Sequence, residues 1–267
     1  MSGVARRPVR RQRGGGGGWS APDAPTDDDV AVEEPLEIRV EGRPLVVLMR
    51  TPGDDLDLAA GFLYTEGVID GADDIRAMAH SPGDLAGNTV DVLLAAGVEG
   101  HRAQLERATR ERFASSACGV CGTASIDRLL VGGVRREARF EPDPAHLAAG
   151  IARLGAAQAG FARTGGLHAA GLLAPDGTLD VVREDIGRHN AVDKVLGWRL
   201  RADRVPVDDR ILLVSSRAGY EIVQKALAAR IPCVAAIGAA SSLAIDLARA
   251  ANLTLVAFLR PDRLNIY

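Results

Sequence analysis

The C-terminal part of the chain decides its fold class, beginning with Ile211-Leu212-Leu213-Val214-Ser215-Ser216-Arg217. Two further short apolar runs follow at residues 233–237 and 254–259, and helical patterns over residues 220–230 and 242–251 separate the three runs. Strands that alternate with helices over short connections form a parallel sheet with right-handed crossovers. The sequence therefore predicts an α/β fold with a parallel βαβαβ unit at the C-terminus.

The carboxyl ends of these predicted strands form a candidate binding site. Ser215 and Ser216 follow the first strand, Ser241 follows the second, and residues 258–263 leave the third. Open α/β sheets bind ligands at this edge, where helix N-termini favour phosphate. The chain has neither a Walker A motif nor G-x-G-x-x-G, and serine-rich turns also occur where nothing binds. Cys233, on the middle strand, is expected to act as small apolar filling.

The N-terminal part reads as α+β. Apolar alternation predicts a β-hairpin over residues 36–49, and residues 89–94 look like another strand. Between them, we expect a helix that Thr51 caps and Pro52 opens at its first position, ending near Gly67. We expect three regions: a disordered Arg/Gly-rich tail over 1–29, a hairpin and helix region over 30–135 that ends in the loop with two cysteines, and a C-terminal α/β domain over 136–267.

The stretch before the βαβαβ unit predicts a helix over residues 144–159 with Asp143 as its cap, then a hairpin around residues 175–177. Residues 183–194 are mostly polar or ionisable, and we expect most of them to form a solvated helix face. The exception is His189-Asn190 beside Glu184-Asp185 at the start of a helix, which is less easily explained in this way. His168, in a glycine-containing turn, and His189, at the start of the next helix, are candidates without an assigned role.

Composition excludes several classes of protein. The 267 residues carry a formal net charge of −3, which gives no case for nucleic-acid binding. Three cysteines do not form a disulfide framework, so a reducing compartment is expected. The sequence has no apolar run long enough for a membrane span and no signal-peptide pattern, so we expect a cytoplasmic protein.

Two of the cysteines lie in Cys118-Gly119-Val120-Cys121-Gly122, a C-x-x-C spacing before a predicted helix at 124–130. Such a pair serves as a zinc half-site, a dithiol/disulfide couple or a thiolate that carries sulfur, and it can also be an inert buried pair. A helix N-terminus favours the thiolate. The zinc-deaminase signature pairs H-x-E with P-C-x-x-C, whereas Ala117 precedes Cys118 and no histidine begins H-x-E. We therefore expect no intrinsic metal.

Several motifs together resemble the FdhD family of formate dehydrogenase accessory sulfurtransferases. The resemblance covers about residues 30 to 267. In order, the matching stretches are residues 51–54 (TPGD), 61–67 (GFLYTEG), 118–122 (CGVCG), 164–170 (TGGLHAA), 184–194 (EDIGRHNAVDK), 215–217 (SSR), 258–260 (FLR) and 265–267 (NIY).

The resemblance implies a cytidine-deaminase-like fold and a homodimer. It also implies a sulfur carrier that accepts persulfide sulfur from a cysteine desulfurase and passes it to the molybdenum cofactor, bis(molybdopterin guanine dinucleotide). The sulfurated cofactor then serves formate dehydrogenase. By the same resemblance, Cys118 carries the persulfide and Cys121 is its neighbour in the site, with molybdenum or tungsten as the metal of the acceptor.

By the same resemblance, the family's cofactor-binding segment falls at the end of the third strand. A guanine nucleotide such as GDP would mimic the cofactor there. Together with the serines of the other strand ends, the predicted cofactor-binding residues are Phe258, Leu259, Arg260, Pro261, Asp262, Arg263, Ser215, Ser216 and Ser241. Three alternatives remain: a zinc-binding deaminase-like enzyme, a dithiol oxidoreductase, and a non-catalytic molybdenum-cofactor chaperone.

Overall fold

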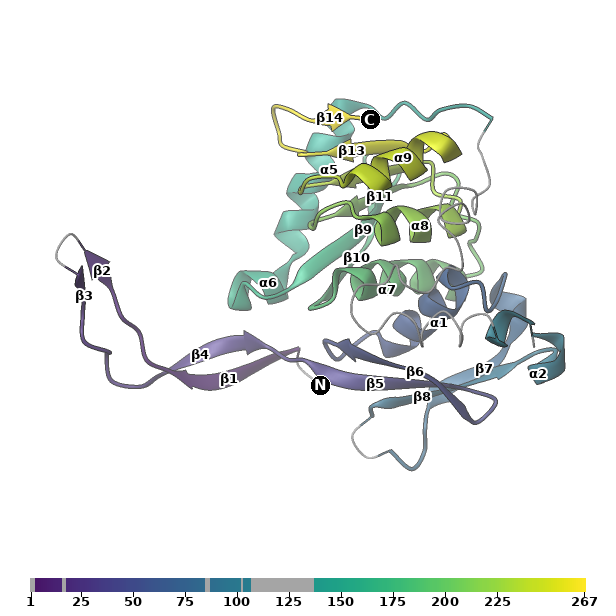
Figure 1. The fold of residues 1–267 in the computed structure, drawn as a ribbon, viewed down its shortest axis with the longest axis horizontal. Coiled ribbons are helices and arrows are strands. Elements are labelled where there is room, and N and C mark those ends of the chain that lie inside the picture. Colours follow the sequence, from purple (N-terminus) through teal and green to yellow (C-terminus); the bar gives the residue numbers. More distant parts are fainter. Residues whose placement is uncertain (1–2, 16–17, 85–86, 102, 107–136) are drawn as a thin grey trace.

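The computed structural model describes residues 3–15, 18–84, 87–101, 103–106 and 137–267 (Figure 1). Its largest sheet has six strands in the order β10-β9-β11-β12-β13-β14. β12 pairs in parallel with β11 and β13, which confirms the predicted parallel unit, whereas β9, β10 and β14 make the sheet mixed because they pair antiparallel. The strands are β9 (His168–Leu173), β10 (Leu179–Asp185), β11 (Ile211–Val214), β12 (Cys233–Ala236), β13 (Thr254–Ala257) and β14 (Asn265–Ile266).

Helices cover both faces of this sheet. Their bounds are α5 (Pro144–Ala157), α6 (Ala159–Thr164), α7 (Arg188–Arg201), α8 (Tyr220–Ala228) and α9 (Ser242–Ala251). Successive strand residues point to opposite faces. Leu212 and Val214 accordingly join the core beneath α7, α8 and α9, while Ile211 and Leu213 join the core beneath α5. Cys233 is fully buried in the second core, where its role is apolar filling as predicted.

A second sheet lies on the other side of α7. It has the order β6-β5-β8-β7 and carries α1 on its buried face. β5 and β6 form the predicted hairpin, and β8 is the predicted strand at residues 89–94. The elements of this part are β5 (Glu34–Val40), β6 (Arg43–Arg50), α1 (Asp55–Thr65), the 3-10 turn η1 (Ala72–Asp74), β7 (Ile75–His80), β8 (Thr89–Leu94) and α2 (Gly97–Gly100).

The two parts share one hydrophobic core, because α1 packs directly against α7. Two glycines permit the close approach. A Cβ built on Gly61 would lie 1.8 Å from the carbonyl oxygen of Asp193, and one built on Gly197 would lie 1.8 Å from that of Asp57. The predicted boundary near residue 135 lies outside the described residues. α1, which precedes this boundary in the chain, packs directly against α7, which follows it.

The N-terminal segment forms an arm rather than the disordered tail that we expected (Figure 1). β1 (Val4–Val9) pairs antiparallel with β4 (Thr26–Ala31), and β2 (Gly14–Gly15) with β3 (Gly18–Trp19). The prediction rested on the polar composition and on the lack of apolar periodicity, and neither shows which charges will face one another across a ribbon. In the structure the pairing sets Arg6 opposite Asp29 and Arg7 opposite Asp28, so that opposite charges meet across the ribbon.

The start of α1 also differs from the prediction. The helix begins at Asp55, and Asp54, in a left-handed conformation, takes the N-cap position without a capping hydrogen bond from its side chain. Thr51 caps nothing, because its hydroxyl donates to the carbonyl of Val32 and accepts from the backbone N–H of Ile186. In contrast, Asp143 caps α5 as predicted, accepting from the N–H of Ala145 at 2.7 Å.

Across the described ranges, no helix combines the length and the apolar character that a membrane crossing requires.

Candidate functional site

The predicted ligand edge exists. β10, β11, β12 and β13 all end on the side of the six-stranded sheet where α7, α8 and α9 begin and where the loop joins β13 to β14 (Figure 1). We call this side the carboxyl edge. The cysteines Cys118 and Cys121 and the helix predicted at 124–130 lie outside the described residues, so their placement stays a prediction.

The predicted serines stand on the carboxyl edge and already have partners. The Ser215 hydroxyl accepts from the N–H of Ala169 at 2.8 Å, which binds the end of β11 to the start of β9. Ser216 is buried and donates to the carbonyl of Arg217 at 3.1 Å. Ser241 caps α9 by accepting from the N–H of Ala244 at 3.3 Å. The three hydroxyls therefore bond to the protein itself at the carboxyl edge. A ligand there would bind the backbone groups and the other side chains of the edge.

The predicted segment at residues 258–263 continues the same edge. Phe258 is 44% exposed and has a φ of 51°, a left-handed conformation that costs a bulky residue energy. Its N–H donates to the carbonyl of Gly238, which binds it to the loop after β12. Arg260 donates through Nη1 to the carbonyls of Ile237 and Leu259, both at 2.8 Å.

Leu259 is buried, whereas Pro261, Asp262 and Arg263 are exposed. The segment therefore presents an aromatic ring and two arginines at the end of β13. Of the two, Arg260 is the more constrained, because one of its nitrogens holds two backbone carbonyls. An exposed ring held by strained backbone, with cationic neighbours, suits stacking on a flat anionic ligand.

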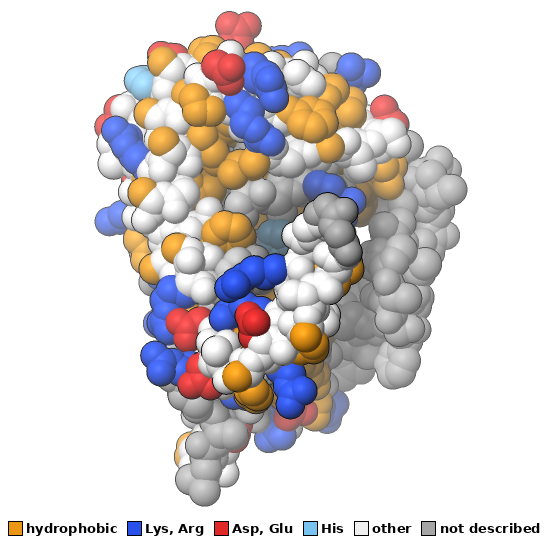
Figure 2. All heavy atoms as spheres, turned by 90° about the vertical axis from the view of Figure 1, so that its left-hand side faces the viewer, with side chains coloured by type: hydrophobic (Ala, Val, Ile, Leu, Met, Phe, Trp, Pro, Cys, Tyr) orange, Lys and Arg blue, Asp and Glu red, His pale blue; other side chains and the backbone are white. Residues whose placement is uncertain are grey.

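The start of α7 adds a group of charged residues to the edge. His189 pairs through Nε2 with the carboxylate of Glu221, at the start of α8, and Arg188 lies 3.9 Å from the same carboxylate. The His189 contact lowers the pKa of Glu221 below its usual value. His168 lies alongside, at the start of β9 opposite Asp185. Figure 2, which looks onto this side, shows a hollow with a histidine side chain at its floor and Lys or Arg side chains beside it.

His168 is half-buried, and its pKa is lowered from the usual 6.5. Burial is the main cause, and the positive charges of Arg188, His189 and Arg217 act in the same direction, while Asp185 opposes them. The imidazole of His168 is therefore held in its neutral form. The sequence singled out His168 and His189 without a role, and their place at the carboxyl edge is a finding of the structure.

Asp185 does not face solvent as part of a charged helix face. It is fully buried and accepts hydrogen bonds from Thr51 N–H, Gly187 N–H and the Asn190 amide. It also pairs with Lys194 at 2.8 Å. The prediction of a solvated face over residues 183–194 is therefore wrong for Lys194, which is buried, whereas Asp185 belonged to the group set apart from that face. The two residues join β10 and α7 to the loop before α1.

A second buried pair was missed. Asp193 on α7 lies 3.0 Å from Lys225 on α8, and both are almost fully buried. The Thr65 hydroxyl donates to Asp193 and accepts from Lys225, both at 2.9 Å. Lys225 also lies over the ring of Phe62. Burial raises the pKa of Asp193, and the charge of Asp193 helps to raise that of Lys225. This cluster joins α1, α7 and α8, and Lys225 also reaches the partly exposed carboxylate of Glu66 at 3.2 Å.

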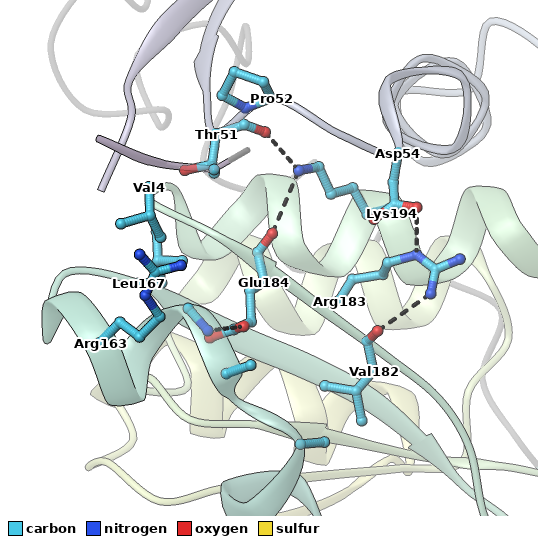
Figure 3. A pocket seen from close by; sticks show the side chains of 14 residues that line it. Val4, Thr51, Pro52, Asp54, Arg163, Leu167, Val182, Arg183, Glu184 and Lys194 are labelled. Atoms are coloured by element: carbon cyan, nitrogen blue, oxygen red, sulfur yellow. Dashed lines mark hydrogen bonds and ion pairs between the residues drawn. The ribbon is translucent and has the colours of Figure 1, made fainter. Parts of the chain in front are cut away.

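A pocket of about 370 Å³ lies between β10, the loop before α1 and the N-terminal arm (Figure 3). Its charged side chains are already paired with the protein. Glu184 accepts from the N–H groups that start α6, at 2.8 Å each, and Lys194 donates to the carbonyls of Thr51 and Glu184. Arg183 pairs with Asp54 and Asp57. The pocket is therefore a weaker candidate than the carboxyl edge.

Among the residues that the structure describes, no group of three or more His, Cys, Asp or Glu side chains is arranged to hold a metal ion.

The fold and the edge thus define a mixed α/β protein with a candidate site for an anionic, partly aromatic ligand. The chain belongs to the FdhD/NarQ family, since the model of that family matches residues 31–267. It is 49% identical over 255 residues, 90% of each chain, to the Sulfur carrier protein FdhD of Mycobacterium tuberculosis. It is 51% identical over 251 residues to the protein of the same name from Anaeromyxobacter sp., covering 90% of this chain and 86% of the relative.

A solved structure shares the fold. The crystal structure of a chain from Desulfotalea psychrophila, assigned as a formate dehydrogenase accessory protein, matches with a TM-score of 0.74 and 26% sequence identity. The match covers 98% of this chain and 96% of the other. The mixed α/β fold and the family are therefore established.

Proposed function

We propose that this protein is a sulfur carrier needed for formate dehydrogenase activity, with the persulfide on Cys118. The observation that carries the proposal is the family match over residues 31–267, which includes the Cys118-Gly119-Val120-Cys121 motif, together with relatives named as sulfur carriers. The donor is a cysteine desulfurase. The acceptor is the bis(molybdopterin guanine dinucleotide) cofactor of molybdenum or tungsten, which is cargo rather than a resident group.

The loading step is a thiol–persulfide exchange. The Cys118 thiolate attacks the outer sulfur of the donor's persulfide, a new sulfur–sulfur bond forms, and the donor's own sulfur–sulfur bond breaks. The donor cysteine leaves as a thiolate, so sulfur is moved without net oxidation. Cys121, three residues away, is a neighbour whose share in this step the sequence leaves open.

The carboxyl edge supports the acceptor part of the proposal. It combines the exposed ring of Phe258 with the arginines at positions 260 and 263, at the end of a sheet whose helices begin there. A guanine dinucleotide arm offers a flat base and phosphates, which match these two kinds of group. We also propose the homodimer, the cytoplasmic location and the cytidine-deaminase-like form of the fold, as the family resemblance implies.

Whole-protein mass spectrometry tests the carrier role. After incubation with a desulfurase and cysteine, we expect a mass gain of one sulfur, about 32 Da, that a reductant reverses. Cys118→Ala should abolish the gain and formate dehydrogenase maturation, while the buried control Cys233→Ser should keep the gain. A gain that persists in Cys118→Ala and disappears in Cys121→Ala would move the assignment to Cys121. Normal maturation by a Cys118→Ala, Cys121→Ala double variant would favour a non-catalytic chaperone, and stoichiometric zinc would favour the deaminase-like enzyme.

A further inference from the structure

Three helices begin at the carboxyl edge, and their first turns differ. Ser241 caps α9, and α8 has the acid Glu221 in its first turn, so both have a partner for their free N–H groups or their dipole. α7 has neither, because its N-cap is Gly187 and its first turn lacks an acid and holds Arg188 and His189. Cations at a helix N-terminus are repelled by the dipole, so this sequence does not serve the stability of α7.

Other basic side chains gather at the same place from different elements. Ser215 exchanges two hydrogen bonds with Ala169, which places the residues after β11 beside the start of β9. His168 therefore stands next to the loop that carries Arg217. Arg188 and Arg217 both act on the His168 ring through their charges, so the cluster contains groups from β9, α7 and the β11–α8 loop.

The acids near this cluster do not balance it. Asp185 already accepts from Lys194, Asn190 and two backbone N–H groups, and Glu221 is engaged by His189, with Arg188 at 3.9 Å. Arg217 is exposed and has no ion-pair partner within the part of the chain that the structure describes. Excess positive charge at an edge built for ligands indicates an anion as the missing partner.

We infer that His168, Arg188 and Arg217 form a subsite for a phosphate or pyrophosphate group, separate from the segment at 258–263. The inference rests on the proposed function and deepens it, because it assigns the phosphates of the guanine nucleotide to one end of the edge. β11 and β13 are two strand spacings apart, about 10 Å. A nucleoside diphosphate can cover that span with its base at Phe258 and its phosphates at Arg217. Guanidinium groups bind phosphate through paired, charge-assisted hydrogen bonds.

Calorimetric titration of the full chain at low salt tests the subsite with three probes: inorganic pyrophosphate, GDP and guanosine. We expect Arg188→Gln and Arg217→Gln each to weaken pyrophosphate and GDP at least about tenfold, the effect of losing one charge-assisted contact. Guanosine, which lacks phosphate, should bind both variants as it binds the unchanged protein. The matched control is Arg249→Gln, in the last turn of α9 and far from the N-terminus of that helix. This variant should bind all three probes as tightly as the unchanged protein does.

Three outcomes overturn the inference. One is pyrophosphate that fails to bind, or binds both variants as tightly as the unchanged protein. Another is a loss of guanosine affinity in the two arginine variants as large as their loss of GDP affinity, which would place the arginines in the base site. The third is weaker pyrophosphate with unchanged GDP, which would indicate a site for free anions only. None of these touches the persulfide on Cys118, so the mass gain reports on the carrier role independently.

Discussion

Two groups of charged side chains meet on α7, and they differ in how completely they are paired. The closed group contains Asp185, Asp193, Lys194 and Lys225, all buried, with each charge facing an opposite one. The open group, at the first turn of the same helix, consists of His168, Arg188 and Arg217 with His189 and Glu221 beside them. Charges of the first kind hold the two sheets together, and charges of the second kind remain available to a ligand.

The difference follows from position. The middle of α7 is covered by α1 on one side and by the six-stranded sheet on the other, so a charge there loses water and must find a partner. The first turn lies at the edge of the sheet, where water solvates a charge until a ligand replaces it. One helix therefore carries a structural segment and a binding segment, separated by little more than a turn.

The largest effect should come from forcing α1 and α7 apart at their closest contact. Gly61→Ala and Gly197→Ala each place a methyl group 1.8 Å from a backbone carbonyl oxygen of the facing helix, which cannot move aside as a side chain could. We expect each to lower the free energy of unfolding by more than about 5 kcal/mol, or to prevent folding. Urea unfolding measures the loss. Gly155→Ala is the control, because a Cβ at this exposed position of α5 meets nothing within 4 Å and alanine favours the helix. Equal stability of all three variants would mean that α1 and α7 do not pack so closely.

Removing one member of the closed group should have the next largest effect. Lys194→Met leaves Asp185 buried without its cation, although its hydrogen bonds from Thr51 and Asn190 remain. We expect a loss of about 3–5 kcal/mol in the free energy of unfolding, as for other broken buried pairs. The exposed substitution Arg217→Gln, in the open group, should change it by less than about 0.5 kcal/mol. Similar losses for both variants would remove the distinction between the two groups.

Sequence patterns predicted the elements that depend on local signals. The apolar runs of β11, β12 and β13, the hairpin of β9 and β10 and the Asp143 cap of α5 all follow from residues close together in the chain. The carboxyl edge followed as well, since a parallel βαβαβ unit leaves little choice of where its strands end. On this edge, the candidate serines and the segment at 258–263 were correctly placed.

Long-range pairing could not be read in the same way. Thr51 looked like a helix cap, but its partners are Val32 and Ile186, the latter 135 residues away. The closed group was missed for the same reason, because Asp193 and Lys194 end a segment that is mostly polar or ionisable, and nothing local shows which of its charges α1 will cover. A glycine at position 61 or 197 could have suggested close helix packing, yet only the facing backbone shows how close.

The smallest effect concerns the pH dependence of stability at the open group. Because the folded state lowers the pKa of His168 below 6.5, the neutral ring is favoured by folding. The contribution to stability is complete above 6.5 and is lost as the pH falls through the lowered folded value. We expect the free energy of unfolding of His168→Gln to fall less steeply than that of the unchanged protein as the pH is lowered below 6.5, measured by urea unfolding at a series of pH values.

A bound anion should reduce this difference. The positive charges that hold the His168 pKa down belong to Arg188, His189 and Arg217, with Asp185 acting against them. A phosphate or pyrophosphate among these groups would screen them and favour the charged imidazole, which raises the pKa. With saturating pyrophosphate, the unchanged protein should therefore lose less stability on acidification and approach the profile of His168→Gln. Arg249→Gln, in the last turn of α9 and outside the open group, should show the same response to pyrophosphate as the unchanged protein. If pyrophosphate leaves the pH profile of the unchanged protein as it is, no anion binds beside His168, and the open group is only a solvated surface.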